Sequence, residues 1–173
     1  VEEGREAVAE EPTEDWLPYF AENSRSFRFA ARLFPPEEER TIAGVYAFCR
    51  FTDDLVDGRD DLPAYQLTQR VNGWRALVEA AYQGTHTGVP LLDEVMGAAA
   101  ERQVPLKYPM ALIDGVEMDV RPRRYRTISD LQVYTYRVAS VVGLWITELF
   151  GIHEPWMLDR ATSLGHAMQL TNI

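Results

Sequence analysis

The chain has 173 residues, 46% of them apolar, one cysteine and a formal net charge of −10. This length suits one domain with its own core, and the acidic balance argues against a general nucleic-acid surface, which needs clustered lysine and arginine. A single cysteine excludes an internal disulfide framework and fits a reducing compartment, and no apolar run reaches the roughly 18 residues of a membrane-spanning helix.

The N-terminal segment 1–15 is predicted to be a disordered tail, because it carries seven acidic residues against one arginine. Residues 16–173 are predicted to form part of one all-α domain, since no segment alternates apolar and polar residues with period two. Cap residues, prolines and apolar periodicity predict at least six helices. They cover residues 24–34, 36–57, 63–83, 91–102, 105–120, 130–151 (capped by Ser129) and 155–173.

The helix over 36–57 carries a polar stripe through an apolar run. At 100° per residue, Tyr46, Arg50, Asp53 and Asp57 share one face, and most of their neighbours are apolar. We therefore expect this helix to be buried almost all round, with its stripe facing a cavity or another polar surface. Arg50 offsets one charge, and two carboxylates one turn apart suit a hard cation such as Mg²⁺. The alternative is a solvated acidic helix end.

The helix over 130–151 places Tyr134 and Val138 four residues apart. It also has a face of small residues, formed by Ala139, Ser140 and Gly143. Such a face permits close helix packing or leaves space for a ligand, and packing is the commoner explanation. A glycine inside a helix costs about 1 kcal/mol relative to alanine, so Gly143 requires a structural or functional reason.

The last helix carries Gln169 and Asn172 three residues apart among apolar neighbours. Buried amides usually satisfy neighbouring polar groups, and they can also bind cations through their carbonyl oxygens. The three histidines lack the spacing of a zinc site and are interpreted as structural or solvent-facing. Cys49 is interpreted as a small apolar side chain of the buried helix.

Four segments in this order resemble the squalene/phytoene synthase family of head-to-head prenyl synthases. They are Ser24-Arg-Ser-Phe27, Tyr46 to Asp57, Tyr134 to Gly143 and Leu164 to Ile173. The segments YAFCRFTDDLVD and IDGVEMDV are most similar to the bacterial phytoene synthase branch. The resemblance implies an isoprenoid-synthase-type helical bundle around a central cavity, of which this chain is the N-terminal part.

The resemblance also implies roles for individual residues. Asp53 and Asp57 match the first aspartate motif, which binds Mg²⁺, with Mn²⁺ as an alternative, against a prenyl diphosphate. Asn172 matches a ligand at the start of the second metal motif, and Tyr134 matches a tyrosine that assists proton removal or steers the carbocation. The positions that match substrate-binding residues are Ser24, Phe27, Tyr46, Arg50, Val138, Ala139, Gly143 and Gln169.

The function that the resemblance implies is condensation of two geranylgeranyl diphosphates through a cyclopropylcarbinyl (prephytoene) diphosphate to phytoene. One alternative is a squalene or hydroxysqualene synthase that uses two farnesyl diphosphates, with NADPH for squalene. A second is a non-catalytic assembly or scaffold protein on the same fold, and a third is a plain helical interaction domain. The expected location is the cytoplasm, with peripheral contact at the inner face of the membrane and no nucleic-acid partner.

Two departures from the family pattern affect these expectations. The family continues past Asn172-Ile173 with Leu-Arg-Asp-x-x-x-Asp, whereas this sequence stops there. The second pair of aspartates is then missing, and we expect the piece alone to be inactive. Thr135 and Ser140 stand where cysteine and glycine are frequent, and both replacements are conservative.

Overall fold

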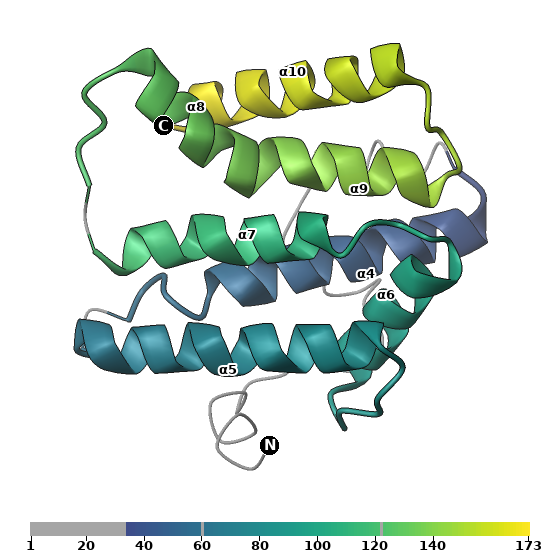
Figure 1. The fold of residues 1–173 in the computed structure, drawn as a ribbon, viewed down its shortest axis with the longest axis horizontal. Coiled ribbons are helices and arrows are strands. Elements are labelled where there is room, and N and C mark those ends of the chain that lie inside the picture. The colour runs from purple at the N-terminus through teal and green to yellow at the C-terminus, as the bar shows by residue number, and fades with distance from the viewer. Residues whose placement is uncertain (1–33, 60, 122) are drawn as a thin grey trace.

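The computed structural model describes residues 34–59, 61–121 and 123–173, which are coloured in Figure 1. Every regular element in these ranges is helical, which confirms the predicted all-α class. The predicted tail, the helix expected before Pro35, and Ser24 and Phe27 on it lie outside the described residues. The elements are α4 (Pro36–Asp53), α5 (Ala64–Tyr82), α6 (Pro90–Glu101), α7 (Lys107–Glu117), the 3₁₀ helix η1 (Met118–Val120), α8 (Ile128–Thr135), the π-helix η2 (Tyr136–Ser140), α9 (Val141–Leu149) and α10 (Pro155–Asn172).

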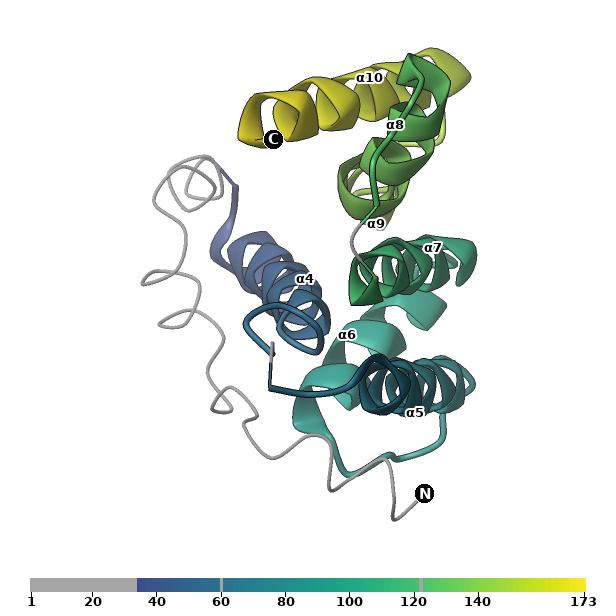
Figure 2. The same ribbon diagram turned by 90° about the vertical axis from the view of Figure 1, so that its left-hand side faces the viewer.

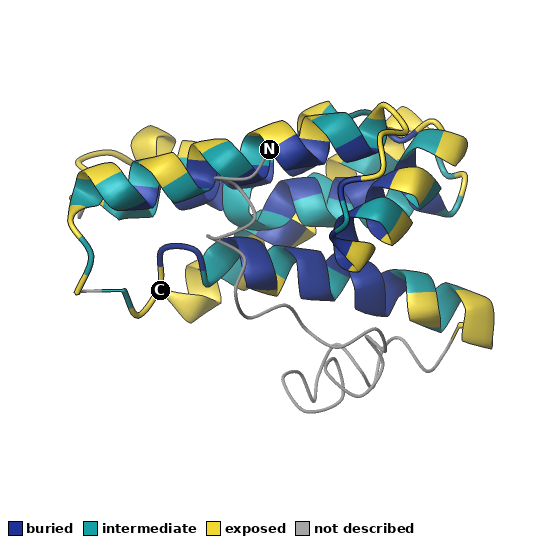
Figure 3. Cartoon of the chain, turned by 90° about the horizontal axis from the view of Figure 1, so that it is seen from below, coloured by how far each residue is buried: buried dark blue, intermediate teal, exposed yellow. Residues whose placement is uncertain are grey.

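The helices pack in layers. In Figure 1, α5, α7, the α8–α9 arm and α10 follow one another from bottom to top, and Figure 2 shows α4 and α7 facing each other below α8 and α10. Figure 3 shows buried residues along the faces that the helices turn toward one another. None of the helices in the described ranges has both the length and the apolar character needed to cross a membrane.

An aromatic cluster joins three helices at the centre of the core. The ring of Phe48 on α4 packs against Trp74 of α5 and edge-on against Trp145 of α9, with centroids 5.8 and 5.2 Å away. All three side chains are at most 1% exposed. Buried aromatic rings contribute large apolar areas to stability, so this cluster fixes α4 relative to α5 and α9.

Helix α4 begins as predicted and ends earlier. Proline occupies its first turn beside Glu37, Glu38 and Glu39, which favour the positive end of the helix dipole. The α-helix stops at Asp53 rather than Asp57, because the chain tightens into turns. The Val56 N–H bonds to the Asp53 carbonyl three residues back, at 3.0 Å, and Gly58 takes a φ of +68°.

The predicted helix over 130–151 is in fact three elements. Its N-cap is Thr127 rather than Ser129: the Thr127 hydroxyl accepts from the Asp130 N–H at 3.1 Å, and the Asp130 carboxylate accepts from the Thr127 N–H at 3.2 Å. This reciprocal pair forms a capping box, which satisfies two backbone donors at once. The π-helix η2 then interrupts the helix between Thr135 and Val141.

Helix α10 packs onto η2 with its backbone in close contact. A Cβ added to Gly165 would lie 2.4 Å from the Ser140 Cα, and the Ser140 hydroxyl donates to the Thr162 carbonyl at 2.7 Å. Only glycine fits at position 165, because the obstacle is main chain and cannot rotate away. This contact positions the helix that carries Gln169 and Asn172.

We predict that Gly165→Ala lowers the free energy of unfolding by about 2 kcal/mol, because the added methyl forces α10 off η2. The matched control is Gly97→Ala on α6, where nothing lies within 4 Å of the added Cβ. That substitution should be neutral or stabilise the protein by up to about 1 kcal/mol through helix propensity. Urea denaturation of the three proteins measures both effects, and equal stabilities would contradict the close contact.

Candidate functional site

Three carboxylates from two distant segments share one region of the protein. Asp53 ends α4, Asp57 lies in the turns that follow, and Asp119 belongs to η1. Burial raises the pKa of the Asp53 carboxyl, and the negative charge of Asp57 adds to this shift, which brings the pKa to about 6. The positive charge of Arg50 opposes this shift, while Asp119 adds to it more weakly. Excess negative charge therefore gathers around Asp53.

Arg50 neutralises this cluster only in part. Its guanidinium lies 2.6 Å from the Asp54 carboxylate and 3.7 Å from that of Asp53. Arg50 and Asp57 are exposed, and Tyr46 and Asp53 are half-buried, so the prediction of a helix buried almost all round is wrong on this stripe. The apolar faces are buried as expected, because they pack on the aromatic core.

Asp119 connects the acidic cluster to Tyr134. The Tyr134 hydroxyl donates to the Asp119 carboxylate at 3.0 Å, and the ring of Tyr125 packs 5.4 Å from that of Tyr134. Burial raises the pKa of Tyr134, and the neighbouring Asp119 charge raises it further, so the phenol stays protonated at neutral pH. Burial also raises the pKa of Asp119, while the Tyr134 hydrogen bond and Arg123 act in the opposite direction.

Asp119 was not among the site residues predicted from the sequence. The sequence did hold a sign of it. Asp119 is a carboxylate in the segment IDGVEMDV, and it lies between the apolar residues Met118 and Val120, which are buried and half-buried. The negative charge of Asp53 also raises the pKa of Tyr134. The structure thus brings together Asp53, Asp57 and Tyr134, three of the predicted residues, and adds Asp119.

The small-residue face serves helix packing. A Cβ on Gly143 would lie 3.2 Å from the Ala161 carbonyl of α10, and one on Gly115 would lie 2.8 Å from a Val138 methyl. Gly143 therefore backs onto α10 and Val138 packs on α7, which is the commoner explanation weighed above. A role of Val138, Ala139 and Gly143 in substrate binding stays a prediction.

Gln169 and Asn172 lie near the end of α10, where Gln169 is half-buried and Asn172 is exposed. No described contact joins either amide to Asp53 or Asp57, so their predicted roles are not tested. Tyr46 packs partly buried against the core. Its role at the substrate also stays a prediction.

The thiol is held as a structural group, and the histidines are structural or solvent-facing, as predicted. Burial raises the pKa of Cys49 to about 12, so its thiol stays neutral and unreactive. His86 contacts Asp93 at 2.5 Å and His153 lies 3.7 Å from Glu148. His166 shares a 2.7 Å hydrogen bond with the Thr135 hydroxyl.

The carboxylates could supply part of a metal site. Within residues 34–59, 61–121 and 123–173, no three histidine, cysteine, aspartate or glutamate side chains form a complete metal-binding group. Asp53 and Asp57 nevertheless fit Mg²⁺, which binds through one or two carboxylates and takes its other oxygens from water and phosphate.

We predict that Asp53→Asn stabilises the metal-free protein at pH 7 and has no effect near pH 3.5. The folded-state pKa of Asp53 lies above the unfolded value of 3.8, so wild type loses stability as the pH rises from about 4 to about 6. The side chain is 43% exposed, and after screening the gain at pH 7 should be about 1 kcal/mol. Urea denaturation in EDTA measures it, with exposed Asp159→Asn as the control, and a pH-independent difference would contradict the assignment.

The sequence is similar to known proteins along most of its length. The profile of a family described as squalene/phytoene synthase matches residues 20–173. A 15-cis-phytoene synthase of Paracoccus sp. (strain N81106 / MBIC 01143) is 38% identical over 161 residues, 88% of this chain and 51% of the relative. A phytoene synthase of Pseudescherichia vulneris is 35% identical over 159 residues, 88% of this chain and 52% of the relative.

A solved structure shares the fold. The crystal structure of a dehydrosqualene synthase in complex with a ligand superposes with a TM-score of 0.77 and 26% sequence identity. The match covers 99% of this chain and 56% of that one. The chain thus spans about half the length of the curated relatives that it matches.

Proposed function

The chain belongs to the squalene/phytoene synthase family, and from this premise we propose that the protein joins two geranylgeranyl diphosphates head to head to form phytoene. The product would arise through a cyclopropylcarbinyl diphosphate, with loss of pyrophosphate. Both relatives compared above are named phytoene synthases, which favours C20 substrates. The observation that carries the proposal is the pair Asp53 and Asp57 beside the Tyr134–Asp119 hydrogen bond.

The aspartates would bind the cation that the substrate diphosphate requires. Asp53 and Asp57 carry charge that Arg50 does not neutralise, and Asn172 is the proposed ligand from α10. When bound, Mg²⁺ would offset the negative charge of the departing pyrophosphate. Arg50, Tyr46 and Gln169 would contact the substrate with Val138, Ala139 and Gly143, and Ser24 and Phe27 would join them from outside the described residues.

Tyr134 and Asp119 would together accept a proton. The Tyr134 hydroxyl donates its hydrogen to Asp119, so its oxygen lone pairs remain available to the substrate. A proton that leaves the carbocation would bond to the phenolic oxygen, while the proton already on that oxygen moves to the Asp119 carboxylate. The tyrosine ends neutral and the aspartate becomes a carboxylic acid, so the transfer balances without phenolate formation. The raised pKa of Asp119 favours this acceptor.

Two other functions are weighed against this one. The dehydrosqualene synthase neighbour favours two farnesyl diphosphates as an alternative substrate pair, and reduction to squalene would add NADPH. A non-catalytic scaffold is less well supported, because a binding protein has no need for carboxylates held where burial raises their pKa values. Peripheral contact with a membrane remains part of the proposal, since the products are lipids.

The test uses the full-length protein with Mg²⁺ and radiolabelled geranylgeranyl or farnesyl diphosphate. We expect a C40 hydrocarbon from the first substrate. Asp53→Asn should reduce its formation by at least 10³-fold, on the order of a group that acts on the leaving pyrophosphate. The exposed Asp159→Asn variant should keep wild-type activity. Absence of hydrocarbon and cyclopropyl product from both substrates would overturn the enzyme assignment.

A double-mutant cycle tests the proton transfer. Asp119→Asn keeps an acceptor for the Tyr134 hydroxyl and removes the group that takes the proton, so we expect kcat to fall about 100-fold. Tyr134→Phe should lower kcat by a similar factor. The kcat of the double variant should be no lower than that of either single variant, because both residues act in one step. Independent, multiplying losses would show that the two side chains do not act as a unit.

A further inference from the structure

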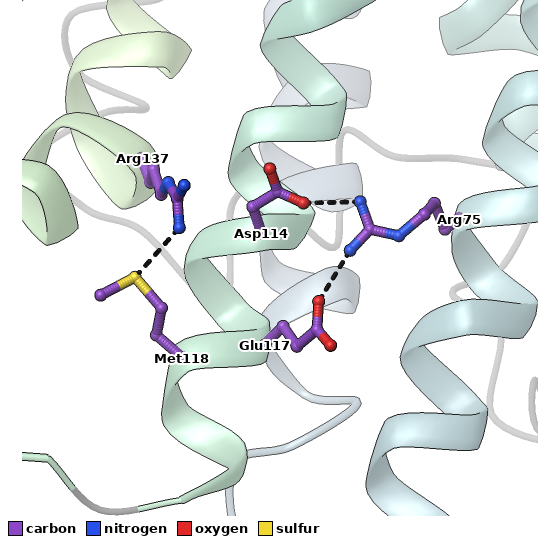
Figure 4. Close-up of polar contacts among 5 residues, drawn as sticks. All are labelled: Arg75, Asp114, Glu117, Met118 and Arg137. Carbon is purple, nitrogen blue, oxygen red and sulfur yellow. Dashed lines mark hydrogen bonds and ion pairs between the residues drawn. The ribbon is translucent and has the colours of Figure 1, made fainter.

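A second polar site, a pocket rich in arginine, lies beside α7. It has a volume of about 360 Å³ and opens between α5, η1 and η2. Its wall on α7 and η1 comes from Asp114, Glu117 and Met118, at helical spacings of three and four. Figure 4 shows these side chains between Arg75 on one side and Arg137 on the other. Arg121 and Arg123 complete the basic part of the lining.

The two carboxylates of the wall already have a cationic partner. The Arg75 guanidinium lies 2.6 Å from the Asp114 carboxylate and 2.9 Å from that of Glu117. This pairing uses both acids of the lining with one arginine. In the part of the chain that the structure describes, no ion pair joins a carboxylate to the lining arginines Arg121, Arg123 and Arg137.

Arg137 is held beside the pocket by a weak acceptor. Its guanidinium donates to the Met118 sulfur at 3.5 Å, as drawn in Figure 4. Arg137 is half-buried and Met118 is buried, so the contact restricts the position of the guanidinium. A thioether accepts hydrogen bonds poorly, and most of the five guanidinium N–H groups remain available.

This local positive charge contrasts with the whole chain. The net charge is −10, so the general field of the protein repels anions. The lining gathers three arginines, and Arg75 offsets one of its two acidic charges, so the surroundings of this cavity are net positive. Planar guanidinium groups match phosphate oxygens with paired hydrogen bonds, and Thr68 adds a hydroxyl to the lining.

We propose that the pocket formed by Arg121, Arg123, Arg137 and Thr68 binds a phosphate-bearing anion without a metal. It is distinct from the aspartate cluster, where three carboxylates would repel an anion until a cation is bound. The proposal does not rest on the proposed synthase activity. The phosphate could belong to free inorganic diphosphate or to the headgroup of an anionic lipid, and the two sources share the same recognition chemistry.

The first arm of the test is calorimetric titration of the full-length protein with inorganic diphosphate in EDTA, at low ionic strength. We expect one saturable site whose affinity falls as salt rises. Arg137→Gln and the exposed Arg121→Gln should each weaken binding at least tenfold. The control Arg160→Gln removes the same charge from α10, where Arg160 lies over the Trp156 ring, and should leave affinity unchanged. Asp53→Asn should also leave it unchanged, because metal-free binding does not involve the aspartates.

The second arm uses sedimentation with vesicles of phosphatidylglycerol and phosphatidylcholine, compared with phosphatidylcholine alone. Binding to the anionic vesicles that is lost in Arg121→Gln and competed by diphosphate would assign the pocket to lipid headgroups. Diphosphate binding without vesicle binding would assign it to the free anion. The proposal is overturned if neither probe binds, if Arg160→Gln weakens binding as much as Arg137→Gln, or if Asp53→Asn abolishes it.

Discussion

The position of the acidic cluster depends on the hydrogen bonds of the Thr52 hydroxyl. It is fully buried, donates to the Phe48 carbonyl at 2.7 Å and accepts from the Trp74 indole N–H at 2.9 Å. A buried N–H without a partner costs roughly 1–3 kcal/mol, so this bond ties the last turn of α4 to α5 in one register. Asp53 is the next residue. Its place is therefore set by the core behind it.

The short helix η1 separates two sites of opposite charge. Its middle residue, Asp119, bonds to Tyr134 beside the aspartates, whereas Met118 before it and Val120 after it line the arginine pocket. Arg123 acts across this boundary, because its positive charge lowers the pKa of Asp119 while burial raises it. A 3₁₀ turn advances about 120° per residue, so neighbouring side chains point in different directions. Three consecutive residues thus serve both regions.

Local signals in the sequence predicted the fold better than they predicted the site. The start of α4 at Pro36 and of α10 at Pro155 follows from proline chemistry within one turn. The end of α4 was predicted four residues late. The hydrogen bond from the Val56 N–H to the Asp53 carbonyl ends the helix there, and the pattern of apolar residues does not reveal it. Asp119 was missed for a related reason: its partner Tyr134 is fifteen residues away, and only the packing of η2 on α7 brings them together.

The π-helical segment η2 makes the number of residues here as important as their identity. One wide turn inserts an extra residue into an otherwise continuous helical run, which rotates everything after it by about 100° relative to everything before it. That phase shift lets α8 turn Tyr134 toward Asp119 while α9 turns Gly143 toward α10. Deleting a single residue from 136–140 would restore a regular helix and leave every side chain chemically intact. It would nevertheless separate the two faces, so this stretch should tolerate substitutions more readily than changes in length.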